Sequence, residues 1–260
     1  MKRLLLVAAL VGAILAPSFS SQAGGLIVCH DVIIIPAPFP RPPIIIRPWP
    51  RPIRHVFAPM ELKSQKVTVK IDNRVARTTV EQVFYNPNPR RQEGTFLFPV
   101  PKGAAIENFQ MEINGKLAKA ELLDAKKARK IYTDIVRTMK DPALLEFSNQ
   151  RLFKVRIFPF EPHGKKRIKL TYSQVLRNDA GLVEYTFPLG TGKYSSKAIG
   201  ELSVSIELAA NAPIKSIYSP THEVEIKRHG NKKATIGFEA KGVTPGSDFK
   251  LYYQPKSKGI

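Results

Sequence analysis

The sequence predicts a mainly β protein: a β-sandwich domain with one amphipathic helix, followed by a second β-rich segment. Two observations support this fold class. Apolar and polar residues alternate in short segments such as 66–71, 168–172 and 201–208, a period typical of strands with one solvent-facing side. Turn-forming pairs such as Asn114-Gly115 separate these segments. Short strands spaced by such turns are typical of a sandwich.

Residues 1–23 have the features of a signal peptide. Lys2 and Arg3 are followed by the apolar run 4–16, which is shorter than the roughly 20 residues that span a bilayer. Small residues at the −3 and −1 positions predict cleavage after Ala23. We therefore expect an exported protein that is periplasmic, at the cell surface or secreted, with an uncleaved N-terminal anchor as the alternative. No second apolar run has membrane length, so we expect no transmembrane anchor in the mature chain.

Residues 24–59 form a Pro/Arg-rich segment that contains nine prolines. Proline fixes φ and lacks the backbone N–H, so we expect an extended polyproline II linker. Arginines within it are candidate contacts for an anionic partner: Arg41, Arg47, Arg51 and Arg54. The alternative is a stalk that lies partly on the following domain.

The remaining chain divides into a first β-rich domain, residues 60–178, and a second β-rich segment, residues 179–260. Asn114-Gly115 predicts a two-residue hairpin turn. Asp124 is a suitable N-cap for an amphipathic helix over residues 125–137, where apolar residues recur at helical spacing. The strands on either side supply the sheets on which this helix would pack.

A series of motifs in order along residues 60–176 resembles the VIT domain, named for vault protein and inter-alpha-trypsin inhibitor heavy chain. The motifs are VEQVFYNP from Val80, EGTFLFPVP from Glu93, FQMEINGK from Phe109, AKKARKIY from Ala125, DPALLE from Asp141 and FKVRIFP from Phe153. The resemblance implies a β-sandwich with one helix that serves as an interaction module without a catalytic centre.

The sequence departs from the common organisation of this family, in which a von Willebrand factor A domain with an Asp-x-Ser-x-Ser metal motif follows. Residues 180–254 resemble the β-rich segment that precedes such a domain, but the motif is absent from this sequence. Metal-dependent adhesion therefore does not carry over. The chain is either a short relative lacking that domain or a piece of a split or truncated gene, and a von Willebrand factor A protein encoded nearby is one expected partner.

Residue spacing gives no candidate catalytic, cofactor-binding or metal-binding site. The five histidines are scattered and Cys29 is the single cysteine, so the sequence lacks the spacing of Cys and His ligands that is typical of a zinc site. The Gly190–Gly192 turn lacks the spacing of a phosphate-binding loop. We therefore expect no nucleotide and no enzyme, with an enzyme of unrecognised type as a remote alternative.

Positive charge suggests another class of partner. The net charge is +20, and it falls to +18 without Lys2 and Arg3. Such a surface attracts an anionic glycan, lipopolysaccharide or another envelope or cell-wall polymer. Segments 152–159 and 165–172 are expected to form a hairpin with its basic residues on one solvent face: Lys154, Arg156, Lys165, Arg167 and Lys169. The alternative is a solvated face neutralised by glutamates on a third strand.

These features support a non-enzymatic, exported interaction module that mediates protein–protein contact or envelope and extracellular assembly. The unknown partner is a protein in this interpretation. The alternative is a basic surface protein that binds a polyanion.

Overall fold

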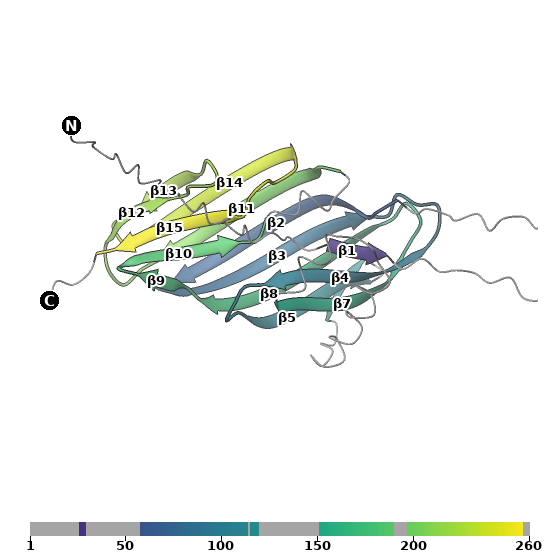
Figure 1. Cartoon of the computed structure of the whole chain (residues 1–260), viewed down its shortest axis with the longest axis horizontal. Helices are drawn as coiled ribbons and strands as arrows, with labels where there is room; N and C mark the ends of the chain where they lie inside the picture. Colours follow the sequence, from purple (N-terminus) through teal and green to yellow (C-terminus); the bar gives the residue numbers. More distant parts are fainter. Residues whose placement is uncertain (1–25, 30–57, 114, 120–150, 190–196, 257–260) are drawn as a thin grey trace, which may run out of the picture.

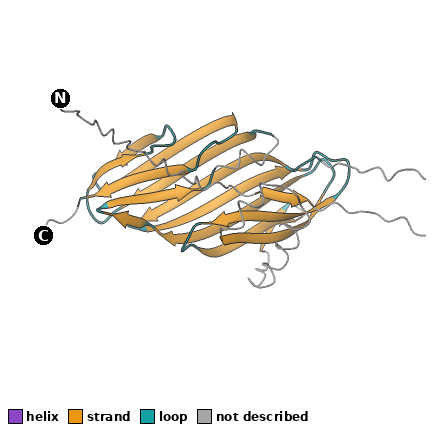
Figure 2. Ribbon diagram, in the orientation of Figure 1, coloured by secondary structure: helices purple, strands orange, loops and turns teal. Residues whose placement is uncertain are grey.

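The computed structural model describes residues 26–29, 58–113, 115–119, 151–189 and 197–256 (Figure 1). Regular structure in this part of the chain is strand, with no helix (Figure 2). The strands are β1 (Leu26–Cys29), β2 (Glu61–Asp72), β3 (Val75–Tyr85), β4 (Gln92–Val100), β5 (Ala105–Ile113), β6 (Lys116–Lys119), β7 (Arg151–Phe160), β8 (Lys165–Val175), β9 (Arg177–Asp179), β10 (Leu182–Phe187), β11 (Ile199–Ala209), β12 (Ile214–Tyr218), β13 (Glu225–His229), β14 (Lys233–Val243) and β15 (Phe249–Pro255). The expected signal peptide and the expected helix at 125–137 lie outside the described residues.

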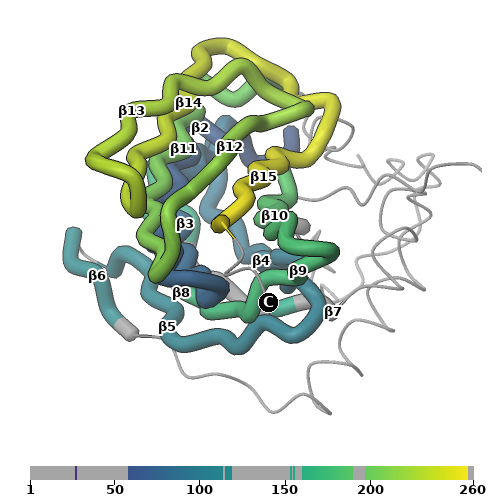
Figure 3. The backbone as a smooth tube through the Cα atoms, turned by 90° about the vertical axis from the view of Figure 1, so that its left-hand side faces the viewer, coloured from purple at the N-terminus to yellow at the C-terminus, as the bar shows by residue number. Residues whose placement is uncertain are grey.

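The strands form a sandwich of two layers, which Figure 3 shows end-on. One layer is an eight-stranded sheet in the order β13-β14-β11-β2-β3-β8-β5-β6. The opposite layer contains a three-stranded sheet, β1-β4-β7, and a four-stranded sheet, β12-β15-β10-β9. The mainly β fold is therefore confirmed.

The VIT-like part and the β-rich segment after it contribute strands to the same eight-stranded sheet. β11 pairs in parallel with β2, and Val204 lies opposite Val67 in this register. The two parts also share one hydrophobic core. The sequence boundary at residue 178 is therefore not a boundary between sheets or cores.

The alternating sequences place their apolar residues between the layers, as expected. Val67, Val69 and Ile71 on β2 are each 2% exposed or less. Aromatic rings meet across the layers, because the Phe96 centroid lies 5.7 Å from that of Phe109. Burial of such a side chain stabilises the fold by about 1.5–3 kcal/mol, so packing between layers supplies much of the driving force for folding.

The expected hairpin between segments 152–159 and 165–172 is wrong. β7 pairs with β4 in the three-stranded sheet, whereas β8 pairs with β3 and β5 in the eight-stranded sheet. The chain crosses from one layer to the other between these strands. Asn86 fixes the crossing, because its side-chain amide donates to the carbonyls of Phe160 and Glu161 at 3.3 and 3.1 Å.

The expected linker at 24–59 begins with residues that form a strand. Leu26–Cys29 are β1, an edge strand that pairs antiparallel with β4. Proline is absent from these four residues, so each retains the backbone N–H that a sheet requires. The chain is described again from Ala58, whose backbone N–H and C=O both bond to the Asn88 side chain.

Candidate functional site

Basic residues on β8 lie on the outer face of the eight-stranded sheet, but glutamates from both neighbouring strands surround them. Arg167 Nε lies 3.7 Å from Glu81 on β3 and 3.6 Å from Glu112 on β5. Lys169 lies opposite Glu81 in the β3–β8 register, and Lys165 lies opposite Tyr85. Neighbouring carboxylates therefore offset the positive charge of this strand.

The other predicted basic residues are not brought to this face. Lys154 and Arg156 belong to β7, where they lie opposite Leu97 and Thr95 of β4 in the other layer. A basic ladder across β7 and β8 therefore does not form. The remaining predicted contacts are in the linker and lie outside the described residues: Arg41, Arg47, Arg51 and Arg54.

In the described part of the chain, no group of three or more His, Cys, Asp or Glu side chains is placed to hold a metal ion. The three histidines there have structural contacts, including His229 Nε2, which lies 3.0 Å from the Thr235 hydroxyl. The ring of His222 packs against Phe238 at a centroid distance of 4.8 Å, and burial lowers the pKa of this histidine. His163 Nδ1 lies 3.5 Å from the Tyr85 hydroxyl.

The described residues contain no helix that could span a bilayer.

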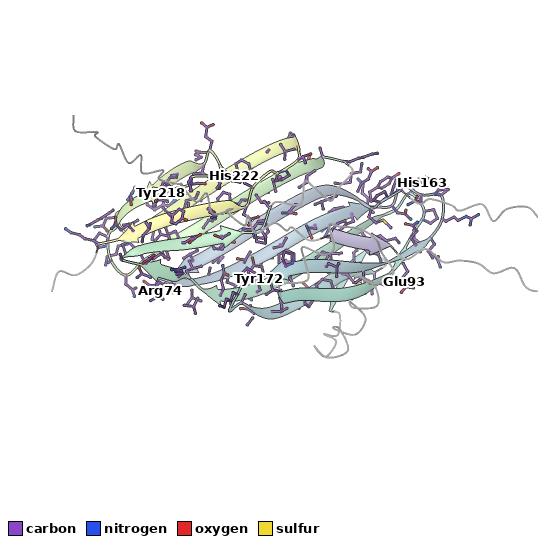
Figure 4. The ribbon with its side chains drawn as sticks, viewed as in Figure 1. Arg74, Glu93, His163, Tyr172, Tyr218 and His222 are labelled. Carbon is purple, nitrogen blue, oxygen red and sulfur yellow. The ribbon has the colours of Figure 1, made fainter. Side chains whose placement is uncertain are left out.

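A pair of stacked tyrosines lies on the outer face of the four-stranded sheet. Tyr218, which is labelled in Figure 4, ends β12 and is paired with Tyr252 on β15. The ring centroids lie 5.4 Å apart, and the interplanar angle is 19°. The Tyr218 side chain is 44% exposed. An exposed aromatic surface on a sheet is typical of contact sites, because tyrosine offers a large area with little conformational entropy to lose.

Charged groups flank the tyrosine pair. Glu184 on β10 lies opposite Tyr252, and Lys250 Nζ lies 4.0 Å from the Glu184 carboxylate. The Thr186 hydroxyl donates to the same carboxylate at 3.0 Å. Burial, followed by the nearby Glu184 charge, raises the pKa of Tyr252.

The strand beneath the tyrosine pair is held firmly. Tyr253, next to Tyr252, points into the core and donates its hydroxyl proton to the Asn73 carbonyl. The Lys250 backbone N–H donates to the Thr221 hydroxyl at 3.0 Å. The Tyr252 ring is therefore presented by a firmly held strand. Sequence reasoning missed this feature, although an aromatic residue at the outward position 252, in an otherwise alternating strand, was a signal for it.

An open hollow lies on the outer face of the eight-stranded sheet, across β2, β11 and β14. Its lining combines hydroxyls, carboxylates and one lysine with two apolar side chains and a glycine: Lys66, Thr68, Ser203, Val204, Ser205, Glu223, Glu225, Gly237, Phe238 and Glu239. The three glutamates make it locally acidic on a chain with a net charge of +20.

Comparisons with known proteins agree with the motifs. The model of the Vault protein inter-alpha-trypsin domain matches residues 62–172. Inter-alpha-trypsin inhibitor heavy chain H2 of Mus musculus is 27% identical over 191 residues, covering 70% of this chain and 20% of that protein. The von Willebrand factor A domain-containing protein 5A of Homo sapiens is 30% identical over 133 residues, covering 50% and 17%.

A crystal structure of a protein from Legionella pneumophila has a TM-score of 0.52 at 14% identity, covering 75% of this chain and 67% of that one. At this identity the likeness concerns the fold alone. The chain spans about a fifth of the length of the two relatives named above. The motifs and the match together identify residues 62–172 of this chain as a VIT domain.

Proposed function

We propose that this chain is a non-enzymatic, exported interaction module that binds a protein partner through the outer face of the four-stranded sheet. The main support for this proposal is the stacked pair Tyr218–Tyr252, an exposed aromatic surface on the paired strands β12 and β15 with Glu184 and Lys250 beside it. Tyrosines in such settings often dominate binding energy at protein interfaces.

One of the relatives suggests the class of partner. The relative from Homo sapiens has a von Willebrand factor A domain by name. A von Willebrand factor A protein, encoded separately and exported to the same compartment, is therefore the partner that we propose for the tyrosine face.

Site-specific photo-crosslinking in the native host tests this proposal. A photoreactive amino acid at position 218 is expected to crosslink a protein with a von Willebrand factor A domain, and the same group at position 175 is the control. Val175 is a suitable control because it is 69% exposed but lies on β8, in the other sheet. Equal crosslinking from both positions, or none from position 218, would reject the tyrosine face.

Affinity measurements with the crosslinked partner provide the second test. Tyr218→Ala is expected to weaken binding at least tenfold, as for an interface hot spot. Val175→Ser should leave the dissociation constant unchanged. The partner, purified as a von Willebrand factor A domain, is titrated by calorimetry.

Polyanion binding is a second candidate, supported by the net charge of +20 and by the arginines at 41–54. Glutamates offset the charge around Arg167. The linker arginines are therefore better candidates for contact with a polyanion than the basic residues of β8. Replacement of all four by glutamine should shift elution from heparin to markedly lower salt. Replacement of Lys165 and Lys169 should shift it less, and unchanged elution of the linker variant would reject this candidate.

A further inference from the structure

The edge of β4 that β1 covers is apolar and almost completely buried. Thr95, Phe96 and Leu97 on β4 are 4%, 1% and 0% exposed. Ile27 on β1 lies opposite Phe96 and is itself 9% exposed, within the core. Without β1, unpaired backbone groups beside this apolar surface would form an edge prone to pair with another strand. The β4 edge therefore needs an occupant.

The two ends of the segment that tethers β1 to the sandwich attach at the same corner. Cys29 lies opposite Gly94. Gln92, two residues before Gly94, accepts a hydrogen bond from Asn88 Nδ2 at 3.2 Å. Asn88 also binds Ala58, at 2.8 and 2.9 Å. If β1 pairs with its own chain, the 28 residues from 30 to 57 must leave this corner and return to it.

The composition of this tether opposes such a reversal. Eight of its residues between 36 and 52 are prolines. Proline-rich sequence favours extended polyproline II, with a rise of about 3.1 Å per residue and a persistence of several residues. Seventeen such residues reach roughly 50 Å when extended. A stiff segment suits a path between two molecules better than a closed loop within one.

We propose that β1 is exchanged between two copies of this chain, so that β1 of each copy pairs with β4 of the other. Exchange of an identical strand keeps every native contact, including that between Ile27 and Phe96. The free-energy difference between the exchanged and the unexchanged form therefore depends on the tether. The proposed partner at this edge is thus a second copy. This inference does not depend on the tyrosine face.

Molar mass in solution gives the first test. The wild-type chain is compared by light scattering, under reducing conditions, with a variant in which residues 36–52 are replaced by a Gly-Ser sequence of equal length. We expect twice the mass of one chain for the wild type and the mass of one chain for the variant. Cys29→Ser should remain dimeric, because the exchange needs no disulfide. A wild type with the mass of one chain would overturn the proposal.

A disulfide trap identifies the strand that is exchanged. Residues directly opposite in an antiparallel pair have Cα atoms about 4.5–5.5 Å apart, within the range that a disulfide bridges. Gly94→Cys should therefore oxidise with Cys29 to a covalent dimer on the wild-type tether and to a disulfide within one chain on the Gly-Ser tether. Gly94→Cys with Cys29→Ser is the control that should give neither.

Two results of the trap contradict the exchange: a disulfide within one chain on the wild-type tether, or a dimer by mass that lacks the covalent link between copies. If Gly94→Cys does not fold, the molar masses of the wild-type and Gly-Ser chains are the only test of the exchange. Equal masses for those two chains then overturn the proposal.

Discussion

The hydroxyls of Thr78 and Tyr185 lie 3.0 Å apart inside the sandwich. Thr78 is on β3 of the VIT-like domain, whereas Tyr185 is on β10 of the segment that follows it. Both side chains are fully buried. This bond therefore joins the two parts of the sequence and the two layers of the fold.

Removal of one partner from this bond should destabilise the whole sandwich. Tyr185→Phe leaves the Thr78 hydroxyl in the core without this partner, at a cost of about 1–2 kcal/mol in the free energy of unfolding. The double variant with Thr78→Val should lose less than the sum of the single losses. Urea unfolding measures all three. Strictly additive losses would show that the hydroxyls do not interact.

Glu61 predicts a dependence of stability on pH. This buried carboxylate lies 2.5 Å from Lys197 Nζ and 2.7 Å from Lys63 Nζ, and these bonds lower its pKa from the ordinary 4.5. A lowered folded-state pKa stabilises the fold above about pH 4.5 and ceases to do so as the pH falls through the folded-state value. Stability should therefore decline on acidification.

Glu61→Gln isolates this contribution. Because both lysines are exposed to solvent, we expect a loss of about 1 kcal/mol at pH 7, which shrinks as the pH falls through the folded-state pKa of Glu61. Glu207→Gln is the matched control, since its pair with Lys70 is 3.5 Å long and mostly exposed. Denaturant unfolding from pH 3 to 7 gives the comparison. A loss that does not vary with pH would contradict the ion-pair account.

Much of the fold was predictable because alternation is a local property. The inward positions of β15, such as Leu251, and the antiparallel pairing of β5 with β6 follow from residues close to each other in sequence. The partners of a strand depend on residues far away. Nothing near β7 or β8 distinguishes a hairpin from a crossing between layers, because the Asn86 bonds that fix the crossing come from 74 and 75 residues earlier.

The candidate site was less predictable for the same reason. Tyr252 is visible in the sequence as an aromatic at an outward position, but its partner Tyr218 is brought to it only by the pairing of β12 with β15. The basic residues of β8 show the opposite case. Their positions were predicted, but Glu81 and Glu112 reach Arg167 through strand pairing, which the sequence pattern does not state.

Two glycines in the eight-stranded sheet should respond differently to a methyl group. A Cβ at Gly200 would lie 2.5 Å from the Lys63 carbonyl oxygen, where β11 approaches β2, whereas a Cβ at Gly237 would meet nothing within 4 Å. Gly200→Ala should therefore lose about 2 kcal/mol of stability through overpacking. Gly237→Ala should be close to neutral. Thermal and urea unfolding compare them, and equal losses would contradict the close approach of these strands.

Asn88 is predicted to hold the start of the sandwich in place. Its side chain bonds to both backbone groups of Ala58, to Asn86 and to Gln92, and it is 5% exposed. Asn88→Ala removes these bonds and leaves buried groups without partners, at a cost of about 2–3 kcal/mol. The freed backbone near Ala58 should also become a site of rapid proteolysis.

Limited proteolysis with sequencing of the new N-termini measures the second effect. Cleavage between residues 55 and 62 should be at least tenfold faster in Asn88→Ala than in the wild type. Asn211→Ala is the control, because Asn211 donates its bond to the Asn73 side chain through the backbone N–H, which the substitution keeps. If Asn88→Ala loses stability without faster cleavage in this window, Asn88 supports the core but does not anchor the chain at Ala58.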